Sequence, residues 1–377
     1  RTSYLVLRIS YLVLLVYIAR KSRMEQITTV AGSPPIFLIG AGGIVNTAHL
    51  PAYQMAGFDV QGIYDLEYDK AVETAKRFSI PMVFKTIEEM LDSLPAKAVF
   101  DIAVPGSAAI PVLKQLPSHS SVLMQKPMGE NLKSAEEILE ITRTKRINAG
   151  VNFQLRYAPF IKEARKMVEE GQIGELNDIE VNVNVHTPWY TWDFLLKSPR
   201  VEILYHSIHY IDLVRSFLGN PETVYAKTTK HPATKDMAPV RSNIIMDYGE
   251  LIRANILTNH SHVFGRQHQQ SYIKLEGSKG AIKISFGVLK NYPQGGEPDK
   301  FEYVITENGR FAEWKSKSIE GSWFPHAFIG SMEQVMLAAA GVIPKADNSV
   351  EDCIFTMACV EAAYRSSEQG GVRPGAL

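Results

Sequence analysis

The segment from Ile36 to Val45 restricts the possible fold of this chain more than any other. Its first four residues, Ile-Phe-Leu-Ile, are typical of a buried strand, and they run directly into the turn Gly-Ala-Gly-Gly, after which the sequence reads as a helix. Dinucleotide-binding proteins need this order, because the first glycine permits a tight turn and the second lets the backbone approach a pyrophosphate. The following helix offers unpaired N–H groups to the phosphates. We therefore expect Gly40, Gly42, Gly43 and Ile44 to bind a dinucleotide.

The glycine motif alone also fits an ordinary strand-to-helix turn, since Val45 replaces the third glycine of the G-x-G-x-x-G pattern. The residues that follow support the first interpretation. Four further apolar runs, separated by predicted helices, are expected strands: 58–64, 82–84, 98–104 and 121–124. Such alternation predicts βαβ units, and continuous apolar runs indicate strands that are buried on both faces. The fold class is therefore α/β, with an N-terminal Rossmann domain, a doubly wound parallel sheet, over residues 34–151.

From about residue 152 the pattern changes. Polar and apolar residues alternate along 178–185 and 271–275, and less regularly along 281–286. This alternation indicates a half-exposed sheet that is largely antiparallel or mixed. Helices are expected at 202–218, 324–341 and 350–368. We predict a second α/β domain with an open sheet over residues 152–377.

Length and composition agree with two globular domains. The 377 residues include 40 basic and 40 acidic side chains, and this balance indicates neither a nucleic acid nor a membrane surface as a partner. Cys353 and Cys359 stand six apart, a spacing that suits neither a zinc knuckle nor a redox C-x-x-C motif. We expect a reduced, cytoplasmic location.

Residues 1–23 do not resemble the rest of the chain. The stretch 4–19 is almost entirely apolar and contains Ser-Tyr-Leu-Val-Leu twice, but its longest uninterrupted apolar run is nine residues, short of the roughly 20 that span a bilayer. A signal anchor is one interpretation. Because the sequence begins with Arg1, and Met24 opens a conventional sequence, we interpret 1–23 as a non-native leader or a misplaced start.

Two residues at the ends of expected strands point to cofactor chemistry. Asp65 lies 25 residues after Gly40, where a carboxylate binds the ribose hydroxyls of NAD and repels the 2′-phosphate of NADP, although an Asp here can also cap a helix. Lys126 follows another strand directly and is fixed by Pro127. Since ligands bind outside the carboxyl ends of parallel strands, Lys126 can donate or relay a proton there, unless it is simply a solvated surface charge. NAD is favoured over NADP.

The expected helix 202–218 carries a further candidate group. Tyr205, His209 and Asp212 recur at i, i+4 and i+7, which places them on one face, with His206 nearby. Transfer of a hydride from an alcohol requires a base for the hydroxyl proton, and histidine is the usual one. The alternative is a histidine that is hydrogen-bonded within the core.

Taken in order, these segments resemble the Gfo/Idh/MocA oxidoreductases, which include glucose–fructose oxidoreductase and inositol dehydrogenase. The resemblance spans about residues 36–374 and rests on the glycine turn with His49-Leu50-Pro51, Asp65, the strand that ends at Pro105, Lys126-Pro127, His209-x-x-Asp212 and the closing 361–366. It implies a C-terminal domain that binds the substrate and whose open sheet forms the interface of a homodimer or homotetramer.

The resemblance also implies roles for single residues. Lys126 corresponds to the lysine of the Glu-Lys-Pro motif and His209 to the catalytic histidine, with Tyr205 and His206 as further members of the catalytic set. The implied cofactor contacts, besides the glycine turn and Asp65, are Val104, Pro105, Gln125, Lys126 and Pro127. Two departures stand out: Gln125 replaces the usual Glu, and Tyr205 replaces the Asp that many members carry four residues before the histidine.

Substrate contacts are expected from Lys126, His206, His209, Arg156 and Trp189. Arg156 matches a family segment on the substrate side and can clamp a carboxylate or two hydroxyls, but a structural ion pair is an equal alternative. Trp189 stands beside Tyr190 and Trp192, and aromatic faces suit the C–H faces of a sugar, although core packing is the more frequent use of Trp.

Three functions remain open. The first is an NAD(P)-dependent dehydrogenase that oxidises a secondary alcohol of a sugar, cyclitol or related polyol, with Lys126 and His209 as acid and base. The second is a non-catalytic NAD-binding sensor or regulator of the same fold. The third is a metal enzyme that uses His206-x-x-His209 and His260-x-His262, with His268 close by, but no carboxylate or cysteine signature accompanies these histidines, and we expect no metal.

Overall fold

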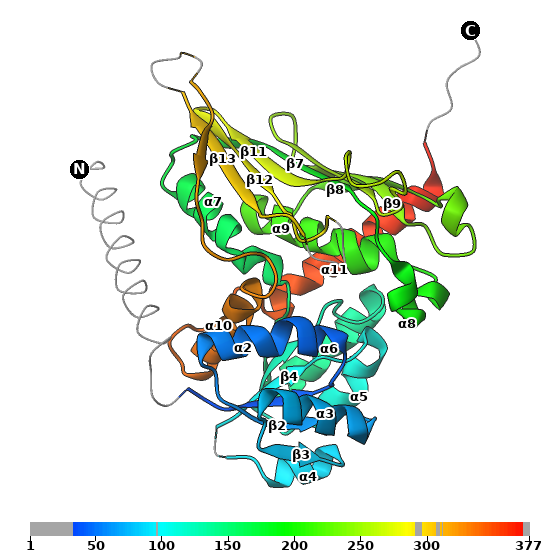
Figure 1. Ribbon diagram of the computed structural model, residues 1–377, viewed down its shortest axis with the longest axis vertical. Helices are drawn as coiled ribbons and strands as arrows, with labels where there is room; N and C mark the ends of the chain where they lie inside the picture. The colour runs from blue at the N-terminus through cyan, green and yellow to red at the C-terminus, as the bar shows by residue number, and fades with distance from the viewer. Residues whose placement is uncertain (1–32, 96, 291–295, 307–309, 311, 372–377) are drawn as a thin grey trace, which may run out of the picture.

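The computed structural model describes residues 33–371, apart from 96, 291–295, 307–309 and 311. The segment 1–23, interpreted above as a leader, lies outside the described residues. Two sheets are stacked along the long axis of the molecule, with helices between and around them (Figure 1). No helix in the described part of the chain is long and apolar enough to cross a membrane.

The N-terminal sheet is fully parallel and has the strand order β3-β2-β1-β4-β5-β6. Its strands are β1 (Ile36–Ile39), β2 (Val60–Tyr64), β3 (Met82–Phe84), β4 (Val99–Ile102), β5 (Ser121–Met124) and β6 (Asn148–Val151). Its helical segments are η1 (Val45–His49), α2 (Leu50–Ala56), α3 (Tyr68–Phe78), α4 (Ile87–Asp92), η2 (Gly106–Ala108), α5 (Ala109–Gln115) and α6 (Leu132–Thr144). The strand order reverses between β1 and β4, which creates the crevice where doubly wound sheets bind nucleotides. The predicted Rossmann architecture is confirmed.

The second sheet has the order β14-β13-β12-β11-β7-β10-β9-β8 and is mixed, because β7 and β10 pair in parallel and all other neighbours are antiparallel. Its strands are β7 (Leu176–Asn184), β8 (Thr223–Thr229), β9 (Arg241–Asp247), β10 (Arg253–Asn259), β11 (Gln270–Gly277), β12 (Gly280–Ser285), β13 (Lys300–Ile305) and β14 (Lys315–Lys317). The helical segments of this half are η3 (Gln154–Tyr157), α7 (Pro159–Glu169), η4 (Trp189–Thr191), α8 (Asp193–Lys197), η5 (Ile203–Ser207), α9 (Ile208–Leu218), η6 (Pro232–Thr234), α10 (Ala327–Ala339) and α11 (Val350–Gln369).

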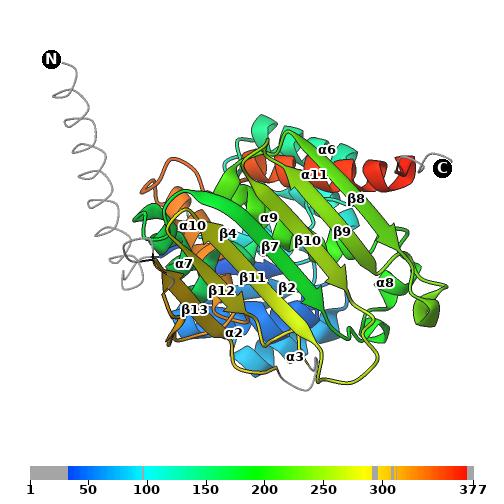
Figure 2. The same ribbon diagram turned by 90° about the horizontal axis from the view of Figure 1, so that it is seen from above.

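The second sheet is covered on one face only. Helices α7, α9 and α11 lie behind it, and its other face is open to solvent (Figure 2). Burial alternates residue by residue along β9 and β10, as expected for strands with one wet face. On the open face, Tyr225, Ile245 and Leu257 are 56%, 52% and 41% exposed. Tyr225 and Ile245 stand directly opposite each other on neighbouring strands.

The helix α10 returns to the N-terminal half of the molecule, where it lies beside α2 (Figure 1). Its apolar side chains Phe328, Met332 and Val335 belong to the same buried cluster as Ile36 and Val45. Val45, which stands at the third glycine position of the motif, is fully buried here. The Rossmann sheet is therefore completed by a helix that begins 176 residues after the end of its last strand, since β6 ends at 151 and α10 begins at 327.

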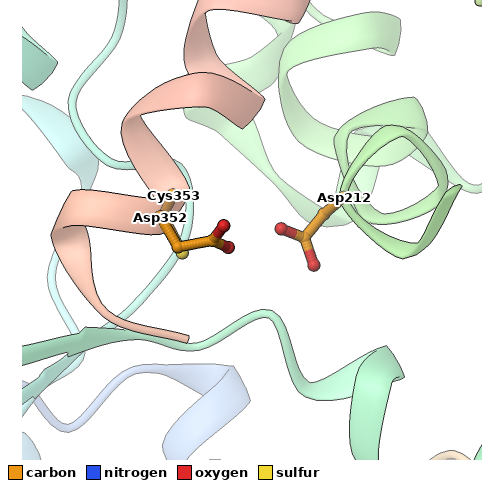
Figure 3. Close-up of side chains that lie close together, drawn as sticks. All are labelled: Asp212, Asp352 and Cys353. Carbon is orange, nitrogen blue, oxygen red and sulfur yellow. The ribbon is translucent and has the colours of Figure 1, made fainter. Parts of the chain in front are cut away.

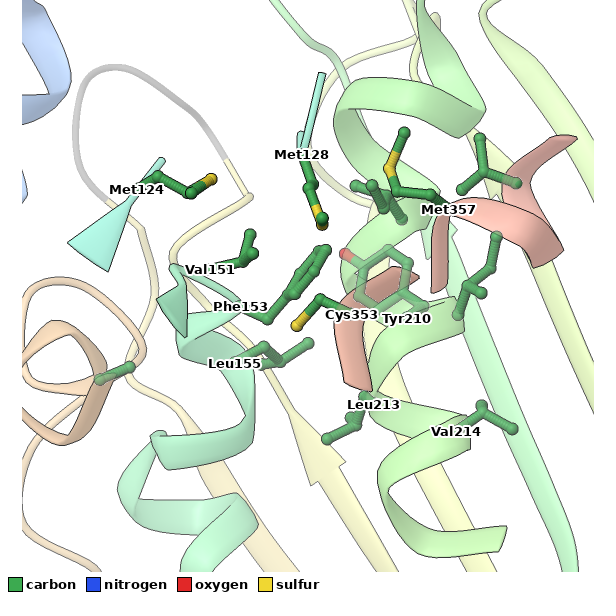
Figure 4. Packing of buried hydrophobic residues seen from close by; sticks show 14 of the residues in the cluster. Met124, Met128, Val151, Phe153, Leu155, Tyr210, Leu213, Val214, Cys353 and Met357 are labelled. Carbon is green, nitrogen blue, oxygen red and sulfur yellow. The ribbon is translucent and has the colours of Figure 1, made fainter. Parts of the chain in front are cut away.

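A second buried cluster continues across both halves. Met124 at the end of β5, Phe153 after β6, Tyr210 on α9 and Met357 on α11 all belong to it (Figure 4). Cys353 is fully buried in the same region and has a free thiol. This shared packing fixes α9, the helix with the candidate histidine, against the carboxyl ends of the parallel strands.

Candidate functional site

The glycine turn has the backbone geometry that a phosphate site requires. Gly40 adopts a φ of +114°, and a Cβ atom on it would lie 2.5 Å from the carbonyl oxygen of Ala103, so only glycine fits. At Gly42 and Gly43, by contrast, a Cβ would meet nothing within 4 Å. The turn is therefore tight on its inner side and open on its outer side, next to the first amides of the helix that follows.

Asp65 holds this turn from the end of β2. Its Oδ2 accepts a hydrogen bond from the amide of Ala41 at 2.7 Å, and its Oδ1 accepts one from the amide of Glu67 at 2.8 Å. Lys70, the nearby cation, is paired with the Glu67 carboxylate. A carboxylate with a second carboxylate beside it suits ribose hydroxyls and disfavours a 2′-phosphate.

A chain of buried hydrogen bonds fixes the side chain of Gln125 at the end of β5. Asn152 Nδ2 donates to Gln125 Oε1 at 2.9 Å and lies 3.3 Å from His49 Nε2. His49 Nδ1 in turn lies 2.7 Å from Asp101 Oδ2, which also accepts from Tyr53 at 2.7 Å. Since the oxygen of the Gln125 amide is used by Asn152, the amide nitrogen is the end left to meet a ligand.

Lys126 follows Gln125 and lies where the two halves of the chain meet. Its Nζ donates to the backbone carbonyl of Tyr205 at 2.9 Å, and the peptide bond to Pro127 is cis. Burial lowers the pKa of Lys126 to about 8. Near neutral pH this amine can therefore both give and accept a proton. Val104 and Pro105 follow the end of β4 at the same edge of the sheet, and Pro105 is exposed.

His209 is buried on α9 with no protein partner for its Nδ1 among the described residues. The ring of Trp323 meets it edge-on at 5.6 Å. Burial, and then the charge of Lys126, hold the pKa of His209 well below its usual value. His209 is therefore a neutral imidazole close to Lys126.

Tyr205 does not replace the missing aspartate as a partner of His209. The turn 203–207 is a π-helical segment, so Tyr205, His209 and Asp212 meet different neighbours instead of forming one row. The Tyr205 ring packs edge-on against Phe194 at 5.7 Å. Burial raises the pKa of Tyr205 to about 12, so its phenol stays protonated.

His206 and Trp189 lie together beside this pair. The ring of His206 lies 5.1 Å from that of Trp189 and 4.4 Å from that of His260. Trp189 is only 5% exposed, packs against His260 and belongs to a buried apolar cluster with Leu195 and Val201. Burial, then the charges of His260 and Lys126, hold the pKa of His206 well below its usual value.

A buried carboxylate that the sequence reasoning missed lies behind His206. Glu202 is 1% exposed, accepts a hydrogen bond from Ser207 at 2.6 Å and one from Ser242, and lies 3.6 Å from His260 Nε2. Burial alone would raise the pKa of Glu202, but His260 and these hydroxyls hold it below its usual value. The available signal was the spacing: Glu202 stands four residues before His206.

Arg156 is engaged by protein carboxylates. Its guanidinium donates two hydrogen bonds of 2.6 Å to Asp212 and one of 2.6 Å to Asp352, and a further one to the carbonyl of Asp347. Arg215 also reaches Asp352 at 3.2 Å. These contacts place Arg156 in an ion-pair network between η3, α9 and α11.

Asp212 and Asp352 point toward each other from α9 and α11 (Figure 3). Within the described residues, one trio of possible metal ligands has its ligand atoms within 4.8 Å of one another: Asp212, Asp352 and Cys353. Because two arginines already neutralise both carboxylates, we interpret this trio as part of the ion-pair network. The histidines considered as metal ligands do not form such a group in this part of the chain.

A cleft of about 730 Å³ opens between the two halves next to Lys126. Its walls come from the loops after β4 and β5, from the segment 194–205 and from α11; they include Pro105, Ser107, Asn131, Lys197, Arg200 and Tyr205. Of the residues predicted from the sequence, Pro105 and Tyr205 line this cleft, and Lys126 is joined to it by the hydrogen bond to the Tyr205 carbonyl. Arg156 is held in the ion-pair network instead.

Comparison with known proteins agrees with this geometry. Residues 35–153 match the model of the oxidoreductase family with an NAD-binding Rossmann fold, and residues 161–283 match the GFO/IDH/MocA C-terminal domain. Glucose-6-phosphate 3-dehydrogenase of Bacillus subtilis is 25% identical over 226 residues, which are 57% of this chain and 63% of that protein. The galactose/lactose metabolism regulatory protein of Saccharomyces cerevisiae is 23% identical over 238 residues, 59% of this chain and 54% of that protein. The matched segments thus span between half and two thirds of the lengths of these two relatives.

A solved structure extends the similarity to nearly the whole chain. An oxidoreductase from Agrobacterium radiobacter, in complex with NAD+, L-tartaric acid and magnesium, superposes with a TM-score of 0.75 at 18% identity, covering 90% of this chain and 98% of that one. At this identity the match speaks for the fold. With both domains matched by family models in the expected order, the chain belongs to the Gfo/Idh/MocA family of oxidoreductases.

Proposed function

We propose that this protein is an NAD-dependent dehydrogenase that transfers a hydride between a secondary alcohol of a sugar, cyclitol or related polyol and the nicotinamide. The observation that carries the proposal is the pairing of Lys126, whose pKa is lowered to about 8, with the neutral imidazole of His209 in the crevice. Perturbed titratable groups that converge in a crevice are typical of acid/base sites.

The residues present fit a dinucleotide. Gly42 and Gly43 leave space for a pyrophosphate beside the helix that starts there, and Asp65 stands where ribose hydroxyls would be bound. The exposed Leu66 and the paired Glu67 offer no cation for a 2′-phosphate, which supports NAD over NADP. When bound, NAD+ supplies the hydride acceptor. Gln125 offers its amide nitrogen to the same crevice.

In this proposal, side chains of the protein serve as the acid and the base. Lys126 is held by the Tyr205 carbonyl, a neutral acceptor, so its ammonium carries no paired carboxylate and loses its proton readily. His209 is neutral and can accept the hydroxyl proton. Lys126 donates a hydrogen bond to the substrate oxygen and passes the proton on.

The test is turnover of purified protein with NAD+ against a panel of sugars and polyols, followed by NADH absorbance. We expect turnover with at least one of them. Lys126→Ala and His209→Ala should each lower kcat by about 10²–10⁴-fold while the Kd for NADH, measured by fluorescence, changes little. Turnover at the wild-type level in both variants would contradict the assignment.

A sensor that binds NAD without turnover is the second candidate. It is favoured by the unpartnered Nδ1 of His209, since no carboxylate orients this imidazole, and by the similarity to a regulatory protein. NADH binding with no turnover on any member of the panel, in either direction, would select this alternative.

A further inference from the structure

Glu202 is a buried carboxylate that forms no ion pair with a Lys or Arg side chain among the described residues. Its oxygens accept from the neutral hydroxyls of Ser207 and Ser242, and Nε2 of the His260 imidazole lies 3.6 Å away. Removing an ionised carboxylate from water costs free energy unless other groups compensate it. Two hydroxyls and one imidazole arranged around it keep Glu202 charged in the interior.

His260 is hydrogen-bonded at one of its ring nitrogens, and the other faces a carboxylate. Nδ1 lies 2.9 Å from the Thr187 hydroxyl, and Nε2 faces Glu202. The carboxylate favours the form with a proton on Nε2, which lets the Thr187 hydroxyl donate to Nδ1. The ring is 1% exposed and has little freedom to turn.

The ring of His206 rests on this fixed imidazole. The centroids of the two rings lie 4.4 Å apart, and Trp189 meets His206 edge-on from another side. His206 is half-buried, at the border between the interior and the crevice. The groups that face it are Lys126 and His209 in the crevice and His260 behind it.

We infer that Glu202 and His260 act as a positioning pair for His206, holding its ring beside Lys126 and placing a negative charge behind it, so that His206 takes up the proton that His209 accepts from the substrate hydroxyl. The inference rests on the proposed dehydrogenase function of the same crevice. During oxidation the carbinol C–H bond breaks and its electron pair leaves with the hydrogen to bound NAD+. The O–H bond breaks as the C=O bond forms, and the proton passes to His209, then to a nitrogen of His206 and finally to water.

Histidine titration by NMR on the full chain tests the pair without relying on turnover. The protein is labelled with ¹³C-histidine, and the His206 signal is assigned from its loss in His206→Asn. In Glu202→Gln, we expect the titration midpoint of His206 to fall by roughly one pH unit, because an imidazolium loses the negative charge behind it. Glu202→Asp keeps the charge and should keep the midpoint near that of the wild type. His262→Gln, on the same segment but outside the cluster, is the matched control and should leave it unchanged.

An unchanged His206 midpoint in Glu202→Gln would overturn the inference. If circular dichroism shows that this variant does not fold, Thr187→Val is the second test, because it removes the hydrogen bond to His260 Nδ1. The His206 midpoint should move in the same direction. A wild-type midpoint in Thr187→Val would also overturn the inference. The pH profile of kcat in Glu202→Gln should shift toward acid by the same amount. Absence of turnover in the wild type would overturn the proposed function, which the titration distinguishes from failure of the pair.

Discussion

At the scale of the residue, the proposed acid/base site depends on Lys126, whose hydrogen-bond partner carries no charge. In the family pattern a Glu precedes this lysine, and here Gln125 occupies that position with its amide oxygen held by Asn152. The ammonium of Lys126 therefore meets a carbonyl dipole only. A partly buried cation without a counter-charge lowers the free energy of unfolding, and it releases its proton more readily than an exposed one.

Replacing Lys126 should stabilise the protein at neutral pH. The pKa of Lys126 is lowered from 10.5 to about 8, so between these values the unfolded chain binds more protons than the folded one, and stability rises with pH. Below pH 8 the full cost is present, and we expect Lys126→Met to gain about 1–2 kcal/mol at pH 7, allowing for partial exposure and the lost hydrogen bond to Tyr205. The gain should fade as the pH rises from 8 to 10.5. Urea denaturation at several pH values measures it.

Lys133→Met is the control for this experiment, since Lys133 is exposed and has no ion pair among the described residues. It should show no pH-dependent gain. A Lys126→Met protein that is less stable than the wild type at pH 7 would show that the ammonium is well compensated in the fold.

Some residues of the candidate site could be predicted from the sequence and others could not. Lys126 and Asp65 could be located because each directly follows an apolar strand, and the end of a parallel strand is a fixed place. The partners of Arg156 could not be located, because Asp352 lies 196 residues away on a helix whose docking depends on the whole second domain. Glu202 was not predicted for the same reason: two of its partners, Ser242 and His260, come from β9 and the segment after β10.

At the scale of the element, the glycines of the turn differ in what requires them: Gly40 is needed by the fold, and Gly42 leaves space for a ligand. Gly40 is required by its φ of +114° and by the carbonyl of Ala103, whereas Gly42 has free space around it. The two positions therefore allow fold and ligand binding to be tested independently.

Gly40→Ala should lower the free energy of unfolding by roughly 2–4 kcal/mol, because the new Cβ would overlap the Ala103 carbonyl in a conformation that L residues avoid. Gly42→Ala should leave stability within about 0.5 kcal/mol of the wild type and weaken NADH binding at least tenfold, since its Cβ enters the phosphate space. Urea midpoints and NADH fluorescence titrations report the two effects. If Gly42→Ala binds NADH as tightly as the wild type, this turn is not the pyrophosphate-binding site.

The ion-pair network is a second element-scale feature, because it joins η3, α9 and α11. In Asp212→Asn the bidentate partner of Arg156 loses its charge while both stay buried, and we expect a loss of about 3–5 kcal/mol in unfolding free energy. Glu137→Gln, which breaks the exposed pair with Lys114, should cost less than about 1 kcal/mol. Equal losses in the two variants would show that the buried network contributes no more than a surface pair.

Elements were predictable where hydrophobic periodicity stayed intact. The strands of the N-terminal sheet were found because they are continuous apolar runs, apart from β6, which is short and begins with Asn148. Strands β8, β9 and β10 were not predicted, since their open-face side chains are Lys, Thr and Asn as well as apolar residues. The buried face of β9 and β10 also carries Ser242 and Thr258, which serve the Glu202 cluster and weaken the alternation.

At the scale of the whole molecule, none of the described helices or strands covers the open face of the second sheet. We propose that two copies of the chain pair through this face, as a homodimer or as half of a homotetramer. The aligned apolar side chains of Tyr225, Ile245 and Leu257 support this, because a large exposed apolar patch on a sheet is typical of an association surface.

Ile245→Asp should shift the protein from oligomer to monomer, because it would bury an unpaired charge in the proposed interface. Light scattering coupled to size exclusion measures the mass. Leu251→Asp, in the exposed turn between β9 and β10, should leave the mass unchanged. A wild-type protein that is monomeric at all concentrations would contradict the proposal.

The return of α10 to the Rossmann sheet has a consequence for how this protein is made. Residues 34–151 leave the ribosome long before 327–339, so the apolar flank formed by Ile36, Val45 and their neighbours stays uncovered during most of synthesis. The N-terminal half cannot be finished by its own residues. Its apolar flank is covered only when the C-terminal helix has been made. A ribosome that stalls in the second domain would therefore release a chain with an incomplete nucleotide-binding domain and exposed apolar surface, to which chaperones would bind.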